Sequence, residues 1–198
     1  MSTQAKTLLT PQQYLEIERK APNKSEYWRG VMFAMAGASR EHNVIVVNLV
    51  ASLHEQLRGR RCEVYSSEMR VFIPRTGLYT YPDVIVVCGD RRFTDDHGDT
   101  LENPTFLAEI LSPSTEGYDR GRKSEHYRTI ESLREYLLVA QDRIHLDLYR
   151  RQPDGAWVLQ EASRLQDTLD LPSIGCRVVV ADIYERLELP ASNPQASA

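Results

Sequence analysis

The chain has 198 residues, of which 41% are hydrophobic and 26% charged, and its formal net charge is −4. This balance is typical of one globular domain that buries its core without disulfides or a structural metal. The acidic charge argues against a protein that coats nucleic acid nonspecifically, and no apolar stretch approaches the about 18–20 residues of a membrane helix.

The N-terminal part is predicted to form a helix and then a hairpin. The helix spans residues 8–20, where Thr10 can act as the cap and Pro11 can occupy the first turn. The hairpin spans residues 26–36, with a turn at residues 29–30. The first residues lack the apolar core and cleavage site of a secretory signal, so we expect a cytoplasmic protein.

The clearest helix is predicted over residues 40–57. Ser39 is a suitable N-cap, and Gly59 follows the end of the helix. The apolar residues that fall on one face at helical spacing are Val46, Leu49, Val50, Leu53 and Leu57. His42 begins this helix, where it is either a surface or capping residue or a contact for a substrate phosphate.

The central part is predicted to contain three strands joined by loops. Residues 62–73 are predicted to form one strand, because the apolar Met69, Val71 and Ile73 alternate with residues 70 and 72, and residues 74–80 are predicted to form a loop. Residues 82–88 and 106–111 are apolar on both faces, which is typical of central strands covered on both sides. The polar residues 89–104 between them are expected to form a surface loop.

The C-terminal part is predicted to contain two helices and several strands. The elements are helices over 117–131 and 181–187 and strands over 135–140, 144–148, 157–159 and 176–180. This order predicts an α/β (α+β) fold, with a mixed β-sheet flanked by helices. We expect one domain over residues 10–189, an N-terminal tail over 1–9 and a disordered C-terminal tail over 190–198.

The three cysteines give no pattern that is typical of a disulfide scaffold or a zinc ribbon. Cys62, Cys88 and Cys176 are isolated, odd in number and without CxxC spacing. Cys88 ends an apolar run, so we interpret it as a buried thiol that acts as a small hydrophobic side chain.

Two carboxylates stand in apolar strands. Asp83 precedes the apolar residues of one predicted strand, and Glu109 lies in the middle of FLAEIL. Burying a carboxylate is costly unless it is paired or binds a metal. Asp83 could instead be a turn residue after Pro82, and Glu109 could form a structural salt bridge. If both lie on neighbouring strands, they offer hard oxygen ligands for Mg²⁺ or Mn²⁺.

A lysine on the following helix could join these acids. Lys123, Tyr127 and Ile130 fall at i, i+4 and i+7, so they share one helix face. The lysine could extend along this face to the surface, or it could reach back towards Glu109. In the second position its ammonium group could orient a water molecule or stabilise charge on a phosphate.

Further charged residues could complete such a site. Glu26 and Glu68 lie at strand-like positions, and either could join the acidic cluster. Because the net charge is acidic, contact with DNA would need local clusters of basic residues. Two clusters are candidates, and each could equally be a solvated face: Arg58, Arg60 and Arg61, and then Arg120, Arg122, Lys123 and Arg128.

Four segments of the sequence resemble one known family. They are EYWRGVMFAMAGASREHN (26–43), SSEMRV (66–71), YPDVIVVC (81–88) and NPTFLAEILSPSTEGYDRGRKSEHYRTIESLREYLLV (103–139). Together they resemble the Uma-two family of endonucleases, which belongs to the restriction-endonuclease-like PD-(D/E)xK superfamily. The resemblance extends over residues 10 to 188, and residues 103–139 are its most specific part.

The resemblance implies a divalent-metal site in a mixed sheet flanked by helices. Asp83 matches the PD aspartate and Glu109 the acid of the (D/E)xK element, which makes both metal ligands. Leu111 stands where the usual lysine would be, and Lys123 matches a lysine position that has moved to the next helix in this family. Glu26 matches an early acidic position that often joins such sites.

Two other positions depart from the pattern of the family. Glu68 stands where relatives often have Asp, and Ala140 stands where they often have Asp after the Leu-Leu-Val run. The difference at Ala140 concerns an outer or structural role and leaves the implied metal ligands in place.

Three functions follow as hypotheses. The first is an Mg²⁺- or Mn²⁺-dependent endonuclease that hydrolyses DNA phosphodiester bonds with Asp83, Glu109, Lys123 and Glu26. The second is a catalytically inactive nuclease fold that binds DNA or protein, which the missing lysine at Leu111 and the acidic charge favour. The third is a metal-dependent hydrolase of another phosphate ester. Because cutting both strands commonly needs two sites, a homodimer is a further expectation.

Overall fold

The protein is represented by a computed structural model that describes residues 8–189. The predicted C-terminal tail lies outside the described residues, as does the predicted N-terminal tail apart from residues 8 and 9. The helices are α1 (Pro11–Glu18), α2 (Arg40–Gln56), α3 (Glu116–Tyr118), the π-helix η1 (Asp119–Lys123), α4 (Ser124–Tyr127) and α5 (Val180–Ile183). Within this part of the chain no helix is both long and apolar enough to cross a membrane.

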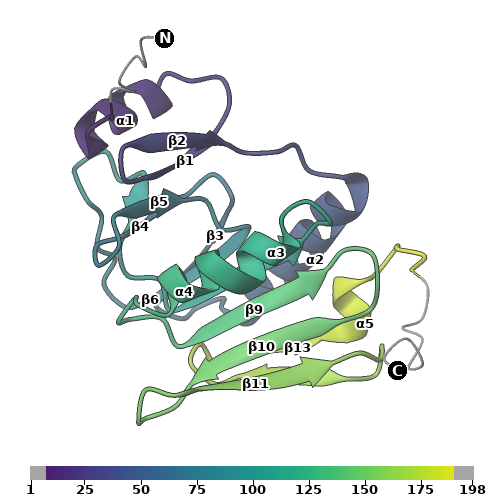
Figure 1. Ribbon diagram of the computed structural model, residues 1–198. Helices are drawn as coiled ribbons and strands as arrows, with labels where there is room; N and C mark the ends of the chain where they lie inside the picture. The colour runs from purple at the N-terminus through teal and green to yellow at the C-terminus, as the bar shows by residue number, and fades with distance from the viewer. Residues whose placement is uncertain (1–7, 190–198) are drawn as a thin grey trace.

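The strands form two larger sheets and one ribbon (Figure 1). The five-stranded sheet has the order β2 (Val31–Ala34), β1 (Ser25–Trp28), β5 (Leu78–Thr80), β4 (Arg70–Ile73), β7 (Thr100–Leu101). The six-stranded sheet has the order β11 (Trp157–Ala162), β10 (Leu146–Arg151), β9 (Glu135–Ala140), β8 (Phe106–Leu111), β6 (Val84–Cys88), β3 (Cys62–Ser66). The ribbon pairs β12 (Thr168–Leu171) with β13 (Cys176–Val179).

The predicted mixed α+β fold is confirmed. In the six-stranded sheet β8 runs parallel to β9, whereas β6 and β8 are antiparallel. One face of this sheet packs against α2, α5 and the β12–β13 ribbon, and the other packs against the five-stranded sheet and the α3–α4 segment. Strands β6 and β8 are therefore covered on both sides, as their apolar sequences predicted.

The predicted starts of the two main helices are also confirmed. Thr10 accepts a hydrogen bond from the backbone N–H of Gln13 (3.2 Å), and the Gln13 side chain accepts one from the backbone N–H of Thr10 (2.9 Å). This reciprocal pair is a capping box. Ser39 Oγ accepts a hydrogen bond from the backbone N–H of His42 (3.0 Å), so Ser39 caps α2.

Two strand predictions were wrong because local alternation does not reveal where a chain changes sheet. Residues 62–73 form two strands, β3 and β4, which a turn separates and which belong to different sheets. Residues 74–80 were predicted as a loop, yet Leu78–Thr80 forms β5 between β1 and β4. Of the two strands in the β12–β13 ribbon, only the second, β13, was predicted.

The helix predicted over 117–131 ends earlier and is not regular. It consists of α3, the π-helical turn η1 and α4, and it ends at Tyr127. Ile130 therefore follows the helix, although its side chain is buried in the same core as Tyr127. A π-helical turn is rare and is often found at functional sites.

The interpretation of Cys88 as a free thiol was wrong. Cys62 and Cys88 form a disulfide bond, and Cys176 is a buried free cysteine. The two bonded residues lie directly opposite each other on the antiparallel strands β3 and β6. Their separation of 26 residues gave no local signal, because the bond depends on the register of two strands.

Candidate active site

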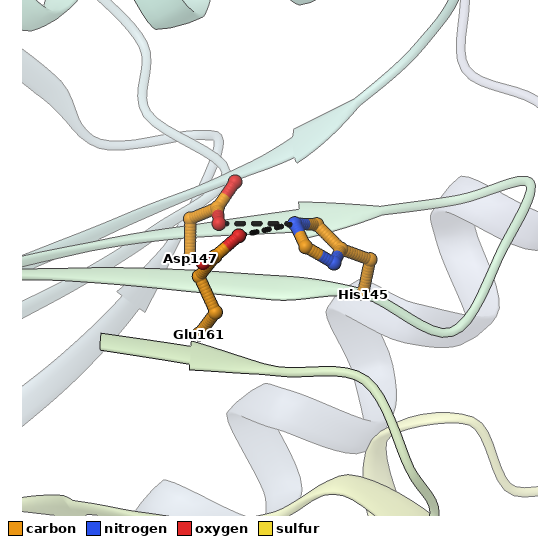
Figure 2. A group of neighbouring side chains, drawn as sticks. All are labelled: His145, Asp147 and Glu161. Atoms are coloured by element: carbon orange, nitrogen blue, oxygen red, sulfur yellow. Dashed lines mark hydrogen bonds and ion pairs between the residues drawn. The ribbon is translucent and has the colours of Figure 1, made fainter. Parts of the chain in front are cut away.

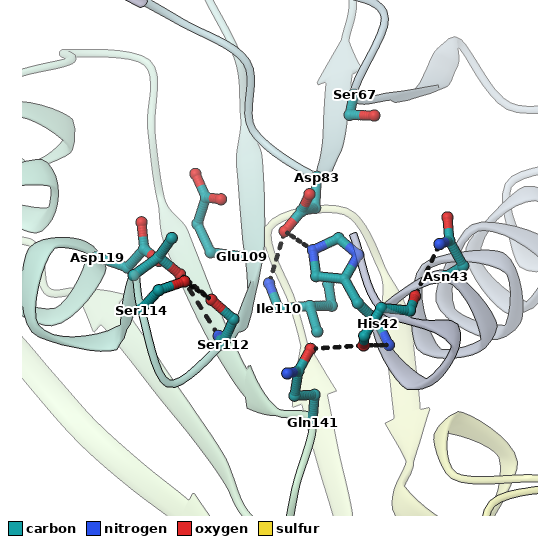
Figure 3. Close-up of polar contacts among 12 residues, drawn as sticks. His42, Asn43, Ser67, Asp83, Glu109, Ile110, Ser112, Ser114, Asp119 and Gln141 are labelled. Atoms are coloured by element: carbon teal, nitrogen blue, oxygen red, sulfur yellow. Dashed lines mark hydrogen bonds and ion pairs between the residues drawn. The ribbon is translucent and has the colours of Figure 1, made fainter. Parts of the chain in front are cut away.

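Asp83 and Glu109 lie next to each other across two central strands. The antiparallel register of β6 and β8 pairs Val84 with Ala108, so Asp83 immediately before β6 falls opposite Glu109 in β8. Figure 3 shows both side chains with Asp119 beside them. Residues opposite each other in antiparallel strands are the closest cross-strand neighbours, so the sheet itself brings these two acids together.

Asp83 is held by the backbone of β8 and by a histidine. Its Oδ2 accepts a hydrogen bond from the backbone N–H of Ile110 (2.8 Å) and lies 3.1 Å from Nε2 of His42 (Figure 3). His42 belongs to the first turn of α2, which Ser39 caps. Both contacts end on Oδ2, so Oδ1 accepts no hydrogen bond from residues 8–189.

Glu109 is buried and makes two strong polar contacts. Its Oε1 accepts a hydrogen bond from the Tyr127 hydroxyl (2.6 Å) and lies 2.8 Å from Nζ of Lys123. The Glu109 side chain is 5% exposed and that of Lys123 is 6% exposed, so solvent screens this ion pair little. The sequence offered two positions for Lys123, and the structure has the one that reaches back to Glu109.

Lys123 lies among three carboxylates. Besides Glu109, its Nζ is 3.4 Å from Asp119 Oδ1, one turn earlier, and 3.4 Å from Glu26 Oε1. The π-helical turn that carries both Asp119 and Lys123 is fixed to β9, because the Tyr136 hydroxyl donates a hydrogen bond to the Asp119 carbonyl (3.2 Å). The lysine is thus the shared counter-ion of the buried acids.

Glu26 reaches this cluster from the five-stranded sheet. It lies on β1 and accepts a hydrogen bond from the Tyr118 hydroxyl on Oε2 (3.0 Å) and another from the Thr80 hydroxyl of β5 on Oε1. The site therefore forms where the two sheets and the α3–α4 segment meet. The structure brings together all four residues that the sequence nominated, namely Glu26, Asp83, Glu109 and Lys123.

The cluster contains more negative than positive charge. Burial raises the pKa of Glu109, and the nearby carboxylates of Asp119 and Asp83 raise it further, while Lys123 opposes the rise. Burial also raises the pKa of Asp119, again against the effect of Lys123. Burial alone would lower the pKa of Lys123, but Glu109, Glu26 and Asp119 outweigh it and raise the pKa, so the lysine stays an ammonium group.

The donor set fits a divalent cation with a preference for oxygen ligands. Asp83 and Glu109 each keep one carboxylate oxygen without a hydrogen bond from the described residues. Three carboxylates, those of Glu26, Glu109 and Asp119, contact the ammonium group of Lys123, and Asp83 lies opposite Glu109. Burial is the main cause of the raised pKa values of Glu109 and Asp119, and neighbouring carboxylates add to it. Mg²⁺ and Mn²⁺ favour such oxygen donors.

Some members of the cluster were not predicted. Asp119 and Tyr118 were missed, although Asp119 lies four residues before Lys123 and thus on its helix face. His42 was left open between surface and substrate roles, and it contacts Asp83 instead. Glu68 does not join the site, because it is exposed and pairs with Lys24 (2.8 Å).

A second polar cluster lies on the β10–β11 hairpin. His145, Asp147 and Glu161 are the one set of three His, Cys, Asp or Glu residues within 8–189 whose ligand atoms all lie within 4.8 Å of one another (Figure 2). His145 Nε2 is 3.0 Å from Asp147 and 3.7 Å from Glu161. Arg120 of η1 also pairs with Asp147, so this cluster has its own cation and links the sheet to η1.

The α+β fold, taken with the match to a family model, identifies a restriction-endonuclease-like protein. The chain belongs to the Uma2 family, described as "Putative restriction endonuclease", whose model matches residues 11–181. It is 39% identical over 181 residues to the uncharacterized protein slr1290 of Synechocystis sp., covering 90% of this chain and 93% of that protein. It is 38% identical over 154 residues to the uncharacterized protein sll1609 of the same organism, covering 78% and 87%.

A solved structure shares the fold at low sequence identity. The crystal structure of a protein from Anabaena variabilis, described as a putative nuclease belonging to DUF820, superposes with a TM-score of 0.72 at 17% identity. The match covers 89% of this chain and 97% of that one. The architecture therefore extends over almost the whole described chain.

Proposed function

We propose that this protein is an endonuclease that hydrolyses DNA phosphodiester bonds and depends on Mg²⁺ or Mn²⁺. The observation that carries the proposal is the meeting of Asp83 and Glu109 across β6 and β8, with the ammonium group of Lys123 2.8 Å from Glu109. The family description supports a nuclease activity. The excess of buried carboxylates supports a divalent cation.

Asp83 and Glu109 would hold the metal ion. When bound, such an ion neutralises charge on a phosphate and lowers the pKa of a coordinated water molecule. Asp83 is suited to this role because its Oδ2 is fixed by two contacts and its Oδ1 accepts no hydrogen bond from the described residues. Glu109 is suited because Tyr127 and Lys123 both contact its Oε1, which leaves Oε2 as a ligand.

Lys123 and Glu26 would organise the charges beside the metal ion. The raised pKa of Lys123 keeps its proton on Nζ, so the lysine can donate a hydrogen bond to a phosphate oxygen but cannot accept a proton as a general base. Glu26 lies 3.4 Å from Nζ and is itself held by Tyr118 and Thr80. It would hold the ammonium group from the five-stranded sheet, on which it lies.

Cleavage of plasmid DNA tests the proposal. Wild-type protein is expected to nick or linearise the plasmid with Mg²⁺ or Mn²⁺ and to lose this activity in EDTA. Asp83→Asn keeps the size of the side chain but removes its charge, so we expect a loss of about 100-fold or more. Glu135→Gln is the matched control, because Glu135 is also buried but pairs with Arg150 (3.0 Å) away from the site. Equal cleavage by wild type and Asp83→Asn would remove the assignment.

The same variants separate the other two hypotheses. A nuclease fold that only binds DNA should retain DNA affinity in EDTA and in Glu109→Gln. A hydrolase of another phosphate ester should leave plasmid intact yet turn over a small phosphodiester with Mn²⁺. Sedimentation of the protein alone tests the proposed homodimer, since one copy carries one Asp83–Glu109 pair.

A further inference from the structure

His42 contacts Asp83 with one ring nitrogen and leaves the other without a partner. Nε2 lies 3.1 Å from Asp83 Oδ2. Nδ1 is buried and has no hydrogen-bond partner within residues 8–189. Leaving a buried polar atom without a partner is costly and rare in folded proteins, so the Nδ1 of His42 asks for an explanation.

The contact with Asp83 requires the imidazole to donate from Nε2. The Asp83 carboxylate is an acceptor, and its Oδ2 already accepts the backbone N–H of Ile110 (2.8 Å). A second donor on the same oxygen fixes the rotation of the carboxylate about its axis. As a consequence Oδ1, which accepts no hydrogen bond from the described residues, is held in one position.

The position of His42 is fixed by the sheet that carries Glu109. Its backbone N–H donates to the Ser39 hydroxyl (3.0 Å), which donates in turn to the Gln141 side chain (3.1 Å). Gln141 follows β9 and donates its backbone N–H to the carbonyl of Leu111 at the end of β8 (3.3 Å). The first turn of α2 is thus connected by hydrogen bonds to the strand of Glu109.

We propose that His42 is a positioning residue of the metal centre, which orients Asp83 so that its Oδ1 is presented as a ligand. This inference rests on the proposed function, in that Asp83 must bind a divalent cation. Partners that orient a ligand in this way commonly change metal affinity by about 10–100-fold when they are removed. The ring makes its contact with Asp83 at Nε2 although this leaves the buried Nδ1 without a partner among the described residues.

Mn²⁺ binding to the full chain, measured by titration calorimetry without DNA, tests the inference. His42→Phe keeps a ring of similar size but has no donor, and we expect it to bind Mn²⁺ at least about tenfold more weakly than wild type. His42→Gln places an amide donor near the position of Nε2, and we expect its affinity to return to within about threefold of wild type. His54→Ala is the control, because His54 is an exposed histidine at the other end of the same helix.

The outcomes distinguish the inference from the proposed function. Wild-type protein that binds no Mn²⁺ would overturn both. Wild type that binds Mn²⁺, with His42→Phe binding equally well, would overturn the role of His42 alone. Equal weakening in His42→Phe and His42→Gln would also overturn it, because the loss would then follow from packing rather than from the donor. Thermal melting of the metal-free variants shows whether each one is folded.

Discussion

Removing the charge of Lys123 should strongly destabilise the metal-free protein. Its Nζ lies 2.8 Å from Glu109 and 3.4 Å from both Asp119 and Glu26, and its side chain is 6% exposed. Lys123→Met keeps most of the side-chain volume and leaves these carboxylates without their counter-ion. Breaking a buried ion pair in this way costs about 3–5 kcal/mol.

That free energy translates into a measurable fall in the melting temperature. For a domain of this size 1 kcal/mol corresponds to about 2–4 °C, so Tm should fall by about 6–20 °C in EDTA. Lys24→Met is the matched control. The Lys24 side chain pairs with Glu68, whose side chain is 82% exposed, and such surface pairs contribute only about 0–1 kcal/mol.

The stability that Lys123→Met loses should depend on pH. Glu109 and Asp119 have raised pKa values in the folded protein, so their contribution to stability is favourable at low pH and is lost as pH rises through those values. Without Lys123 both pKa values rise further. The deficit of Lys123→Met should therefore be largest at high pH and should shrink as the solution becomes acidic.

Metal should oppose the same loss. Mn²⁺ at about 100 times its Kd stabilises a folded protein by about 2.7 kcal/mol, and this gain should be retained in Lys123→Met because the carboxylates remain. Thermal melts followed by circular dichroism, at several pH values and with EDTA or Mn²⁺, give the fall in Tm, its dependence on pH and the gain from Mn²⁺. A deficit equal to that of Lys24→Met, or one that grows towards low pH, would refute the role of Lys123 as the shared counter-ion.

Three further predictions concern the same protein. Mn²⁺ affinity should fall as the pH is lowered, because protons compete for Glu109 and Asp119, whose pKa values are raised; calorimetry that shows no change with pH would contradict this competition. Tyr127→Phe should lower the free energy of unfolding by about 1–3 kcal/mol, since it removes the 2.6 Å hydrogen bond to Glu109, and a denaturant titration that detects no loss would show that this bond contributes little. Reduction of the Cys62–Cys88 bond should lower that free energy by about 2–4 kcal/mol, and a melt unchanged by reductant would count against the bond.

The acidic pair could be predicted from the sequence because burial makes a carboxylate conspicuous. Asp83 and Glu109 interrupt or border two runs that are otherwise apolar, and the structure places these runs side by side as β6 and β8. The approach of Lys123 to Glu109 could be proposed but not decided, since the same spacing allows the side chain to extend to the surface. The structure decided between the two by burying Lys123.

Other features depend on tertiary contacts that leave no local pattern. Residues 62–73 were predicted as one strand from the alternation at residues 69–73, yet the turn between β3 and β4 sends the chain into another sheet. The Cys62–Cys88 bond depends on a register between β3 and β6 that alternation does not specify. The contact of His42 with Asp83 joins a helix end to a strand end 41 residues later, and only the packed structure reveals it.

The most direct test of the metal centre is a crystal of the full chain soaked with Mn²⁺. Anomalous density is expected between Asp83 and Glu109, with carboxylate oxygens of both residues at about 2.0–2.6 Å from the peak. The same soak of Asp83→Asn should show a weaker peak or none. Density at the His145, Asp147 and Glu161 cluster but none between Asp83 and Glu109 would contradict the assignment of the metal-dependent site.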